Sequence, residues 1–192
     1  MRKSFLILLF LVINYGLNAQ YYSKLNLDKQ IKEVISFEVD EIMKSSSDRN
    51  RGRKKINHRI IPWKDAIFYM TTYSHLFSYD DKTKKLTRNN IRKKGNEYSQ
   101  LITDKDLEYM TKQIHSENQA IWNLTFEKGI LRKNPNNKYY EYTIPIFDLS
   151  NKKAVIYKEF TCGSLCAYGS FEIYFEQDGK WTLYKTINIW IS

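Results

Sequence analysis

The chain has 192 residues, of which 42% are hydrophobic and 15% aromatic. That length suits a single domain, and this apolar content excludes an intrinsically disordered chain. The formal net charge is +10, so acidic polymers and anionic surfaces are the partners that composition favours. Beyond the N-terminus no stretch is apolar for the roughly 20 residues that a membrane helix needs, so we expect a soluble mature protein.

Residues 1–19 have the organisation of an export signal. A basic start is followed by an unbroken apolar run at 5–13 and by small residues up to Ala19. We predict cleavage between Ala19 and Gln20, which leaves residues 20–192 as one α+β domain. The protein is then exported, to the periplasm or to the outside of the cell. The alternative is a retained membrane anchor.

Three segments follow before the middle of the chain. Residues 28–43 are predicted to form an amphipathic helix, because apolar side chains recur at helical spacing. The apolar residues within 35–39 also alternate, so a strand is the alternative. Residues 45–57 are polar and basic and are predicted to form a loop. Residues 63–77 are apolar and aromatic without a clear period, so helix and strand both stay open, and 79–82 is typical of a turn.

Nearly all of the positive charge lies in residues 44–94, where fifteen Lys and Arg stand against four acidic residues. If the two basic clusters of this stretch fold onto one face, they would bind an anionic polymer or an anionic envelope surface. The alternative is a solvated surface, because a patch of charge alone is weak evidence. The candidate polyanion-binding residues are Arg49, Arg51, Arg53, Lys54, Lys55, Lys84, Lys85, Arg88, Arg92, Lys93 and Lys94, and Lys82 is the first residue of the second cluster.

The centre of the chain carries a helix start signal. Thr103 and Asp106 have the spacing of a capping box, in which a hydroxyl and a carboxylate three residues later satisfy exposed N–H groups. Leu107, Met110 and Ile114 follow at helical spacing. We therefore predict a helix here, and a second, shorter helix over 116–122.

From residue 139 onward the apolar period changes to two, which predicts strands. We expect four strands at about 139–147, 154–161, 167–176 and 181–190. The connections are short, so the strands must form an antiparallel meander. The predicted fold class is α+β, with N-terminal and central helices packed on this four-stranded sheet.

The last hairpin allows two registers. A two-residue Asp178-Gly179 turn places Trp181 opposite Glu176, whereas a three-residue loop pairs Phe175 with Trp181. A slip of one residue moves every side chain to the other face of the strand. The three-residue loop gives one continuous apolar face, and we therefore predict the longer loop.

Cys162 and Cys166 bracket a short connection between two predicted strands. Paired cysteines of an exported protein usually form a disulfide, and this position brings their Cβ atoms within reach. The ring is small, so the bond is expected to stabilise the hairpin by only about 2 kcal/mol. Redox catalysis is the alternative, although its motifs usually have two residues between the cysteines.

No recognised catalytic motif stands out. His58, His75 and His115 are isolated in the sequence, and each is expected to be structural or on the surface. Asp80 and Asp81 could bind a cation, but a turn is the simpler interpretation. We find neither metal-ligand spacing nor a phosphate-binding glycine loop, so no metal and no cofactor are predicted.

Aromatic residues are frequent in the predicted sheet. If one face of the sheet stays open, their rings could stack on a sugar or a peptide. The alternative, which we favour, is that helices cover the face and that the rings belong to the core. The residues concerned are Tyr139, Tyr140, Tyr142, Tyr157, Tyr168, Tyr174, Tyr184 and Trp190.

The C-terminal third contains four segments with a familiar order: Ile-Pro-Ile-Phe at 144–147, Lys-Ala-Val-Ile-Tyr at 153–157, Cys-Gly-Ser-Leu-Cys at 162–166 and the turn Asp-Gly-Lys-Trp at 178–181. In these segments the chain resembles exported proteins of Bacteroidota whose activity is not established. Ala167 departs from that pattern, because a glycine often follows the second cysteine. The turn is also similar to those of cystatin-like and NTF2-like domains, in which a helix packs on a curved antiparallel sheet. The resemblance implies export and an α+β fold, and it transfers no catalytic residue.

The sequence therefore favours an exported globular protein with a non-catalytic binding or structural role at the cell envelope or outside the cell. The first alternative is a binder of an anionic polymer or surface through residues 44–94. The second alternative is a hydrolase whose site is assembled from residues distant in sequence.

Overall fold

The computed structural model describes residues 28–42, 55–73, 77–88, 101–116, 131–132, 138–163 and 166–191. The predicted export signal with its Ala19–Gln20 cleavage site lies outside these residues. The predicted short helix at 116–122 also lies outside them, apart from its first residue. The same holds for the basic residues Arg49, Arg51, Arg53, Lys54, Arg92, Lys93 and Lys94.

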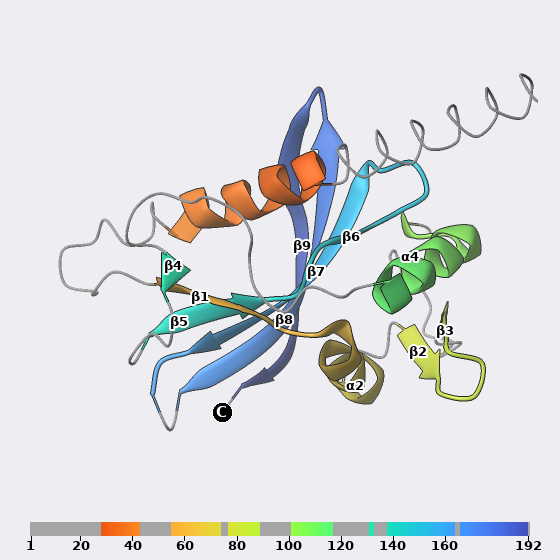
Figure 1. The fold of residues 1–192 in the computed structure, drawn as a ribbon, viewed down its shortest axis with the longest axis horizontal. Helices are drawn as coiled ribbons and strands as arrows, with labels where there is room; N and C mark the ends of the chain where they lie inside the picture. The colour runs from red at the N-terminus through yellow and green to blue at the C-terminus, as the bar shows by residue number, and fades with distance from the viewer. Residues whose placement is uncertain are drawn as a thin grey trace, which may run out of the picture.

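The fold is α+β, as predicted, and its centre is a mixed seven-stranded sheet (Figure 1). Antiparallel pairing joins the strands of the C-terminal half, whereas two further strands add to one edge in parallel. The strand order is β4 (Leu131–Arg132), β1 (Lys55–Ile60), β5 (Tyr139–Tyr142), β7 (Lys153–Thr161), β8 (Ala167–Gln177) and β9 (Lys180–Ile191), and β6 (Ile146–Phe147) also pairs with β7.

The predicted four-stranded meander is only part of this sheet. Its first strand is divided into β5 and β6 by residues 143–145, where Pro145 has no N–H to donate to a ladder. The predicted basic loop at 45–57 is also wrong at its end, because Lys55 begins β1. Ile56 and Ile60 are buried in the core, and this burial accounts for a strand among basic residues.

Helices cover both faces of the sheet. The helix at 28–42 confirms the amphipathic pattern and excludes the alternative strand. Its apolar side chains, which include Val34, Ile35 and Val39, pack on one face. The other face is covered by α2 (Trp63–Tyr73) and α4 (Asp104–Ser116) (Figure 1).

Alternate residues of the central strands serve the two faces. On β7, Ala154 and Ile156 join the core under the helix at 28–42, while Val155 and Tyr157 join the core under α2 and α4. On β8, Tyr174 belongs to the first core. β8 is thus buried on both sides through most of its length.

The segment at 63–77, for which helix and strand were both open, divides into a helix and a strand. Trp63, Ala66 and Ile67 form the buried stripe of α2, at the spacing of one helix face. After residues 74–76 the chain forms a hairpin from β2 (Phe77–Asp80) and β3 (Lys85–Arg88).

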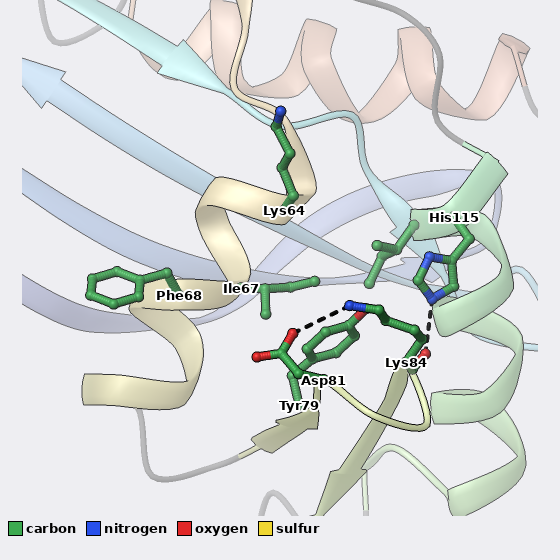
Figure 2. A pocket seen from close by; sticks show the side chains of 8 residues that line it. Lys64, Ile67, Phe68, Tyr79, Asp81, Lys84 and His115 are labelled. Atoms are coloured by element: carbon green, nitrogen blue, oxygen red, sulfur yellow. Dashed lines mark hydrogen bonds and ion pairs between the residues drawn. The ribbon is translucent and has the colours of Figure 1, made fainter.

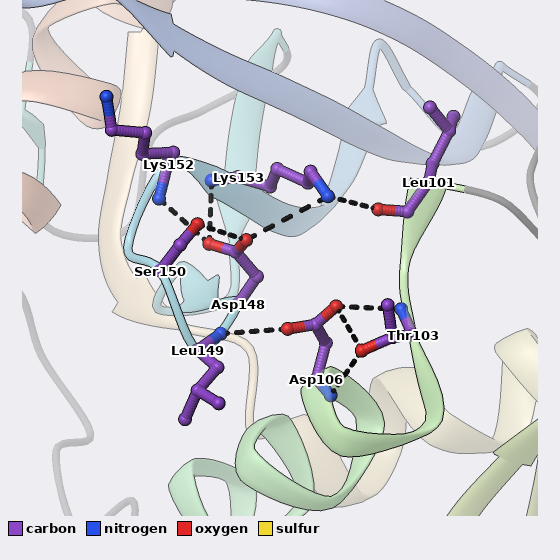
Figure 3. Close-up of polar contacts among 8 residues, drawn as sticks. All are labelled: Leu101, Thr103, Asp106, Asp148, Leu149, Ser150, Lys152 and Lys153. Carbon is purple, nitrogen blue, oxygen red and sulfur yellow. Dashed lines mark hydrogen bonds and ion pairs between the residues drawn. The ribbon is translucent and has the colours of Figure 1, made fainter.

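The capping box at the start of α4 is confirmed. The Thr103 hydroxyl accepts the N–H of Asp106 at 3.2 Å, and the Asp106 carboxylate accepts the N–H of Thr103 at 2.7 Å. The second Asp106 oxygen accepts the N–H of Leu149 at 3.1 Å, in the turn between β6 and β7 (Figure 3). One carboxylate therefore caps the helix and attaches it to the sheet.

Asp148 organises the turn from β6 to β7 in the same region. Its carboxylate accepts the N–H groups of Lys152 and Lys153 at 2.8 and 2.9 Å and the Ser150 hydroxyl at 2.6 Å (Figure 3). Asp148 is almost fully buried, so these donors replace the water that its charge would otherwise bind. The network is structural.

The register of the last hairpin differs from the prediction. The turn has two residues, Asp178 and Gly179, both with positive φ (52° and 77°), and Glu176 lies opposite Trp181. This is the conformation that an Asp-Gly hairpin turn favours. The predicted three-residue loop is wrong because it assumed one apolar face, whereas β8 is buried on both. A register shift between Ile173 and Tyr174 then places Ile173 opposite Lys185 and Phe171 opposite Ile187.

The predicted disulfide between Cys162 and Cys166 is present, with the Cα atoms 5.1 Å apart. The N–H of Cys162 also donates to the carbonyl of Cys166 at 2.8 Å. The bond closes the connection from β7 to β8 and acts as a local staple of that hairpin.

Candidate functional site

A surface pocket of about 380 Å³ lies between α2, α4 and the β2–β3 hairpin (Figure 2). Its walls combine apolar and cationic side chains. Ile67 points into the pocket, whereas Lys64 and Phe68 extend from α2 at its rim (Figure 2). The complete lining is Lys64, Ile67, Phe68, Tyr79, Asp81, Lys84, Ile114 and His115.

The hairpin turn positions the polar side of the pocket. Asp80 accepts the N–H groups of Lys82 and Thr83 at 2.8 and 3.3 Å and the Thr83 hydroxyl at 2.8 Å. These hydrogen bonds keep the pKa of Asp80 below its ordinary value, the one from the Thr83 side chain most of all. Lys84 closes the turn with a positive φ of 55°. Asp80 is thus a turn residue, as the sequence suggested.

Two polar contacts link residues that line the pocket. The Lys84 ammonium lies 3.5 Å from the Asp81 carboxylate, and both side chains are mostly exposed. His115, in the last turn of α4, places Nε2 at 2.8 Å from the carbonyl oxygen of Lys84. A carbonyl only accepts, so Nε2 is the donor of this hydrogen bond. The contact also joins α4 to the hairpin.

The apolar side of the pocket comes from the helices. Ile67 and Ile114 are almost fully buried, whereas Phe68 is 61% exposed. Phe68 packs against Tyr69 with ring centroids 5.6 Å apart. A large exposed aromatic next to a cavity is an available apolar contact for a ligand.

The structure brings only some of the predicted basic residues together. Lys82, Lys84 and Lys85 are exposed in and beside one hairpin turn, and Arg88 ends its second strand. Lys55 begins β1, which lies on the other side of α2 from the hairpin in Figure 1. Of the candidate residues, Lys84 lines the pocket. A single face made by both basic clusters stays a prediction.

Lys64, Tyr79 and His115 are pocket residues that sequence reasoning did not connect with one another. They come from three separate elements, and only the packing of those elements brings them together. His115 was expected to be structural, and its contact with Lys84 supports that role. His58 lies in β1, and His75 lies outside the described residues.

A second cluster is buried on the opposite face of the sheet, beneath the helix at 28–42. Lys158 of β7 contacts the carboxylates of Glu38 and Glu172, the first at 3.1 Å. Glu38 and Glu172 are 3% and 2% exposed. The hydroxyl of Tyr174 contacts both carboxylates, and that of Tyr142 donates to Glu38 at 3.2 Å. The sequence signal was Glu38 itself, a charged residue on the predicted apolar face of a helix.

Burial and mutual repulsion control ionisation in this cluster. Burial, followed by the charge of Glu38, raises the pKa of Glu172 to about 7. Burial alone would lower the pKa of Lys158, but Glu172 and Glu38 together raise it. Burial also raises the pKa of Tyr174, so its phenol stays protonated. The cluster therefore contains one stable cation, two carboxyl groups and a neutral phenol.

A pair of acidic residues lies on the α2 side of the sheet. Glu141 and Glu159 are directly opposite each other on β5 and β7, and burial raises the pKa of both carboxyls. Asn57 donates to Glu141 at 2.7 Å, and the Tyr157 hydroxyl donates to Glu159 at 2.8 Å. Each carboxylate thus has a donor of its own.

The aromatic residues of the sheet mostly belong to the core, which is the interpretation that we favoured from the sequence. Tyr140, Tyr142, Tyr157 and Tyr174 are buried, while Tyr139, Tyr168 and Trp190 are half-buried. Tyr184 is 47% exposed and stacks on Phe175. The helices cover the rings that an open face would have offered.

Within the described ranges, no group of three or more His, Cys, Asp or Glu side chains is arranged to hold a metal ion. In the same part of the chain, no helix is both long and apolar enough to cross a membrane. Comparison of the chain with protein-family models finds no matching family, and comparisons with curated proteins and with solved structures find no match.

Proposed function

We propose that the protein is an exported, non-catalytic binding domain whose pocket takes a small amphipathic anion. The observation that carries this proposal is the pairing of cationic and apolar side chains around one cavity. Lys64 and Lys84 supply positive charge, while Ile67, Phe68 and Ile114 supply an apolar wall. Such a cavity suits a ligand with an acidic head and a short apolar body.

The Asp81–Lys84 ion pair supports reversible binding. Both side chains are largely exposed, so this pair contributes little to stability and exchanges readily with another anion. An incoming carboxylate or phosphate would take the place of Asp81 beside the Lys84 ammonium. Asp81 therefore competes with the ligand.

Export agrees with the basic and apolar order of residues 1–19 and with the disulfide. Mass spectrometry of protein recovered from the growth medium and the cell envelope tests it. We expect a chain that begins at Gln20 and that gains two hydrogens on reduction. A chain that keeps residues 1–19, or one found in the cytoplasm, would contradict export.

The pocket is tested with octanoate and octyl phosphate, and with octanol as the matched uncharged compound. Titration of ¹⁵N-labelled protein followed by NMR should move amide signals of α2, the last turn of α4 and the hairpin. Octanol should bind more weakly, because it lacks the charge that Lys84 attracts. Equal binding of the acid and the alcohol would contradict the proposal.

Four variants test which charged side chains interact with the ligand. Lys64→Gln and Lys84→Gln should each weaken octanoate binding about two- to fivefold, the size of one exposed ion pair. Asp81→Asn should strengthen it by a similar factor. Lys82→Gln is the matched control, because Lys82 lies in the same turn but does not line the pocket. If Lys82→Gln weakens binding as much as Lys84→Gln, and polyphosphate binds with a steep salt dependence, the protein is instead a binder of anionic polymers.

A further inference from the structure

The cluster beneath the helix at 28–42 has more hydrogen-bond acceptors than its donors can serve if both carboxyl groups are ionised. The Tyr174 hydroxyl contacts Glu38 Oε1 and Glu172 Oε2. The phenol has one hydrogen and can donate it to only one of these oxygens. If both groups were carboxylates, the other oxygen would face the phenol oxygen with no hydrogen between them.

The charges of the cluster also favour a proton on one of the two carboxyl groups. Lys158 is the one cation among the described groups that contact these carboxyls, and it contacts both of them. Two carboxylates would leave an uncompensated negative charge in a site where Glu38 and Glu172 are almost fully buried. An unpaired buried charge is strongly unfavourable, and a group in that position takes up a proton instead.

We propose that Glu38 and Glu172 hold one shared proton through Tyr174 and that this proton fastens the helix at 28–42 to the sheet. Glu172 Oε2 carries the proton and donates it to the Tyr174 oxygen, and the Tyr174 hydroxyl donates to Glu38 Oε1. Lys158 then pairs with a single ionised carboxylate, that of Glu38. The cluster lies on the opposite face of the sheet from the pocket, so its shared proton does not depend on the proposed function.

All of the titratable groups that face Glu172 in the described ranges agree with this arrangement. The helix at 28–42 contributes Glu38, β7 contributes Lys158, and β8 contributes Tyr174. Tyr142 and Tyr140 of β5 are the remaining neighbours, and burial raises the pKa of both phenols. β9 places Thr186, which does not titrate, opposite Glu172.

The position of Glu38 makes the proton relevant to docking of the helix. Glu38 lies on the helix, whereas Lys158, Glu172, Tyr142 and Tyr174 belong to the sheet. Loss of the proton to solvent leaves two carboxylates repelling each other across the boundary between helix and sheet. The helix should therefore open more often as the pH rises.

The raised pKa of Glu172 determines whether docking of the helix gains or loses stability as the pH rises. When the helix opens, water reaches this carboxyl and its pKa returns toward the ordinary value near 4.3. The closed form binds the proton more tightly, so closure loses stability as the pH rises from about 4.5 to about 7. Between about pH 5 and pH 8, the opening equilibrium should increase on the order of 50-fold.

Hydrogen exchange measured by mass spectrometry on the intact chain tests this change. After correction for the intrinsic rate at each pH, peptides from 28–42 should lose protection as the pH rises. Peptides from α4 serve as the internal reference and should keep theirs. Equal protection of 28–42 at both pH values would overturn the proposal.

Glu172→Gln provides the sharper test. The Gln side chain donates to Tyr174 and accepts from Lys158 at every pH, so it replaces the protonated acid. Exchange of 28–42 should then be independent of pH. Glu176→Gln is the matched control, since Glu176 lies on the same strand and is paired with the exposed Lys152. That variant should keep the pH dependence of the unchanged protein, and loss of the dependence in both variants would contradict the assignment.

The unchanged protein allows a second measurement should the Glu172→Gln variant fail to fold. The carboxyl ¹³C signal of Glu172, followed by NMR from acid to neutral pH, should show a titration step close to 7. A Glu172 step near the ordinary value of about 4.3 would refute the shared proton.

Discussion

The two faces of the sheet are covered by helices in different ways. The helix at 28–42 covers an apolar core that also contains the buried carboxyls of Glu38 and Glu172 and the partly buried Lys158. On the other face, α2 and α4 cover an apolar core, and the acidic pair Glu141 and Glu159 is only half-buried. β7 and β8 supply both environments through alternate residues.

This difference separates two sources of stability within one domain. Apolar burial depends on area and volume, so the apolar core under α2 and α4 should be insensitive to pH near neutrality. A buried ionic cluster depends on protonation, so the face under the helix at 28–42 should respond to pH. Substitutions on the two faces should therefore differ more in how their effect on the free energy of unfolding depends on pH than in the size of that effect.

The largest effect is expected for Lys158→Met, which removes the cation and leaves both carboxyls buried. Loss of one partner from a buried ionic cluster costs about 3–5 kcal/mol. The loss should be greater near pH 8 than near pH 5, where Glu172 is protonated and only one buried charge is left without its cation. Urea unfolding at the two pH values measures it.

Lys152→Met is the control for that substitution. Lys152 is mostly exposed and pairs with Glu176 at 3.7 Å, so we expect a change within about 0.5 kcal/mol. Equal losses for Lys158→Met at both pH values would attribute its effect to packing of the aliphatic chain and would remove the contrast between the faces.

Met110→Ala should destabilise the other face by about 3 kcal/mol, because Met110 is 1% exposed and the variant leaves a cavity. The loss should be the same near pH 5 and near pH 8. Lys112→Ala, on the exposed side of α4, should change stability by about 0.5 kcal/mol or less. A strong pH dependence of the stability loss in Met110→Ala would contradict the proposed difference between the two faces.

Replacing both Cys162 and Cys166 by Ser should cost about 2 kcal/mol, the value expected for a small closed ring. The disulfide joins β7 to β8, which serve both faces, so its loss should not favour one face. Hydrogen exchange should rise equally in the helix at 28–42 and in α4. A rise confined to one helix would show that the hairpin supports that face more than the other.

Asp106→Asn should cost about 1 kcal/mol at neutral pH, since the carboxylate caps α4. Burial by itself raises the pKa of Asp106. The hydrogen bonds from Thr103 and Leu149 lower the pKa by more than burial raises it, so the net shift is downward. This contribution is present above about pH 4 and is lost as the pH falls below that value. The α4 cap and the Glu172 cluster on the opposite face thus respond to pH with opposite signs.

Thermal unfolding between about pH 2.5 and pH 7 checks the Asp106 prediction. The difference between Asp106→Asn and the unchanged protein should shrink in acid. Glu108→Gln, which removes an exposed charge from the same helix, should have a smaller effect at neutral pH. A difference that persists in acid would show that shape, and not charge, matters at this cap.

Local patterns predicted most of the individual elements correctly. The capping box at Thr103 and Asp106, the helix at 28–42 and the disulfide were each predicted from neighbouring residues. The register of the last hairpin was not, because the alternation of Phe171 and Ile173 was assigned to a sheet with one buried face. Burial on both faces removes the information that alternation normally carries.

The candidate site was less predictable than the elements. Lys84 was among the basic residues named in advance, but nothing local connects it with Ile67 or His115. Those contacts depend on how α2, α4 and the hairpin pack, which periodicity does not specify. The predicted basic face depends on the same kind of information.

The sequence by itself determined the α+β class, the helix start at Thr103, the pairing of Cys162 with Cys166 and the apolar stripe of the first helix. Each of these depends on residues close together in the chain. Only the tertiary structure decided that β1 and β4 join the sheet in parallel and that Glu38 meets Tyr174, 136 positions away. The physical reason is that the burial and charge around such a group are supplied by distant segments, and these change the energy of the group only once the layers are packed.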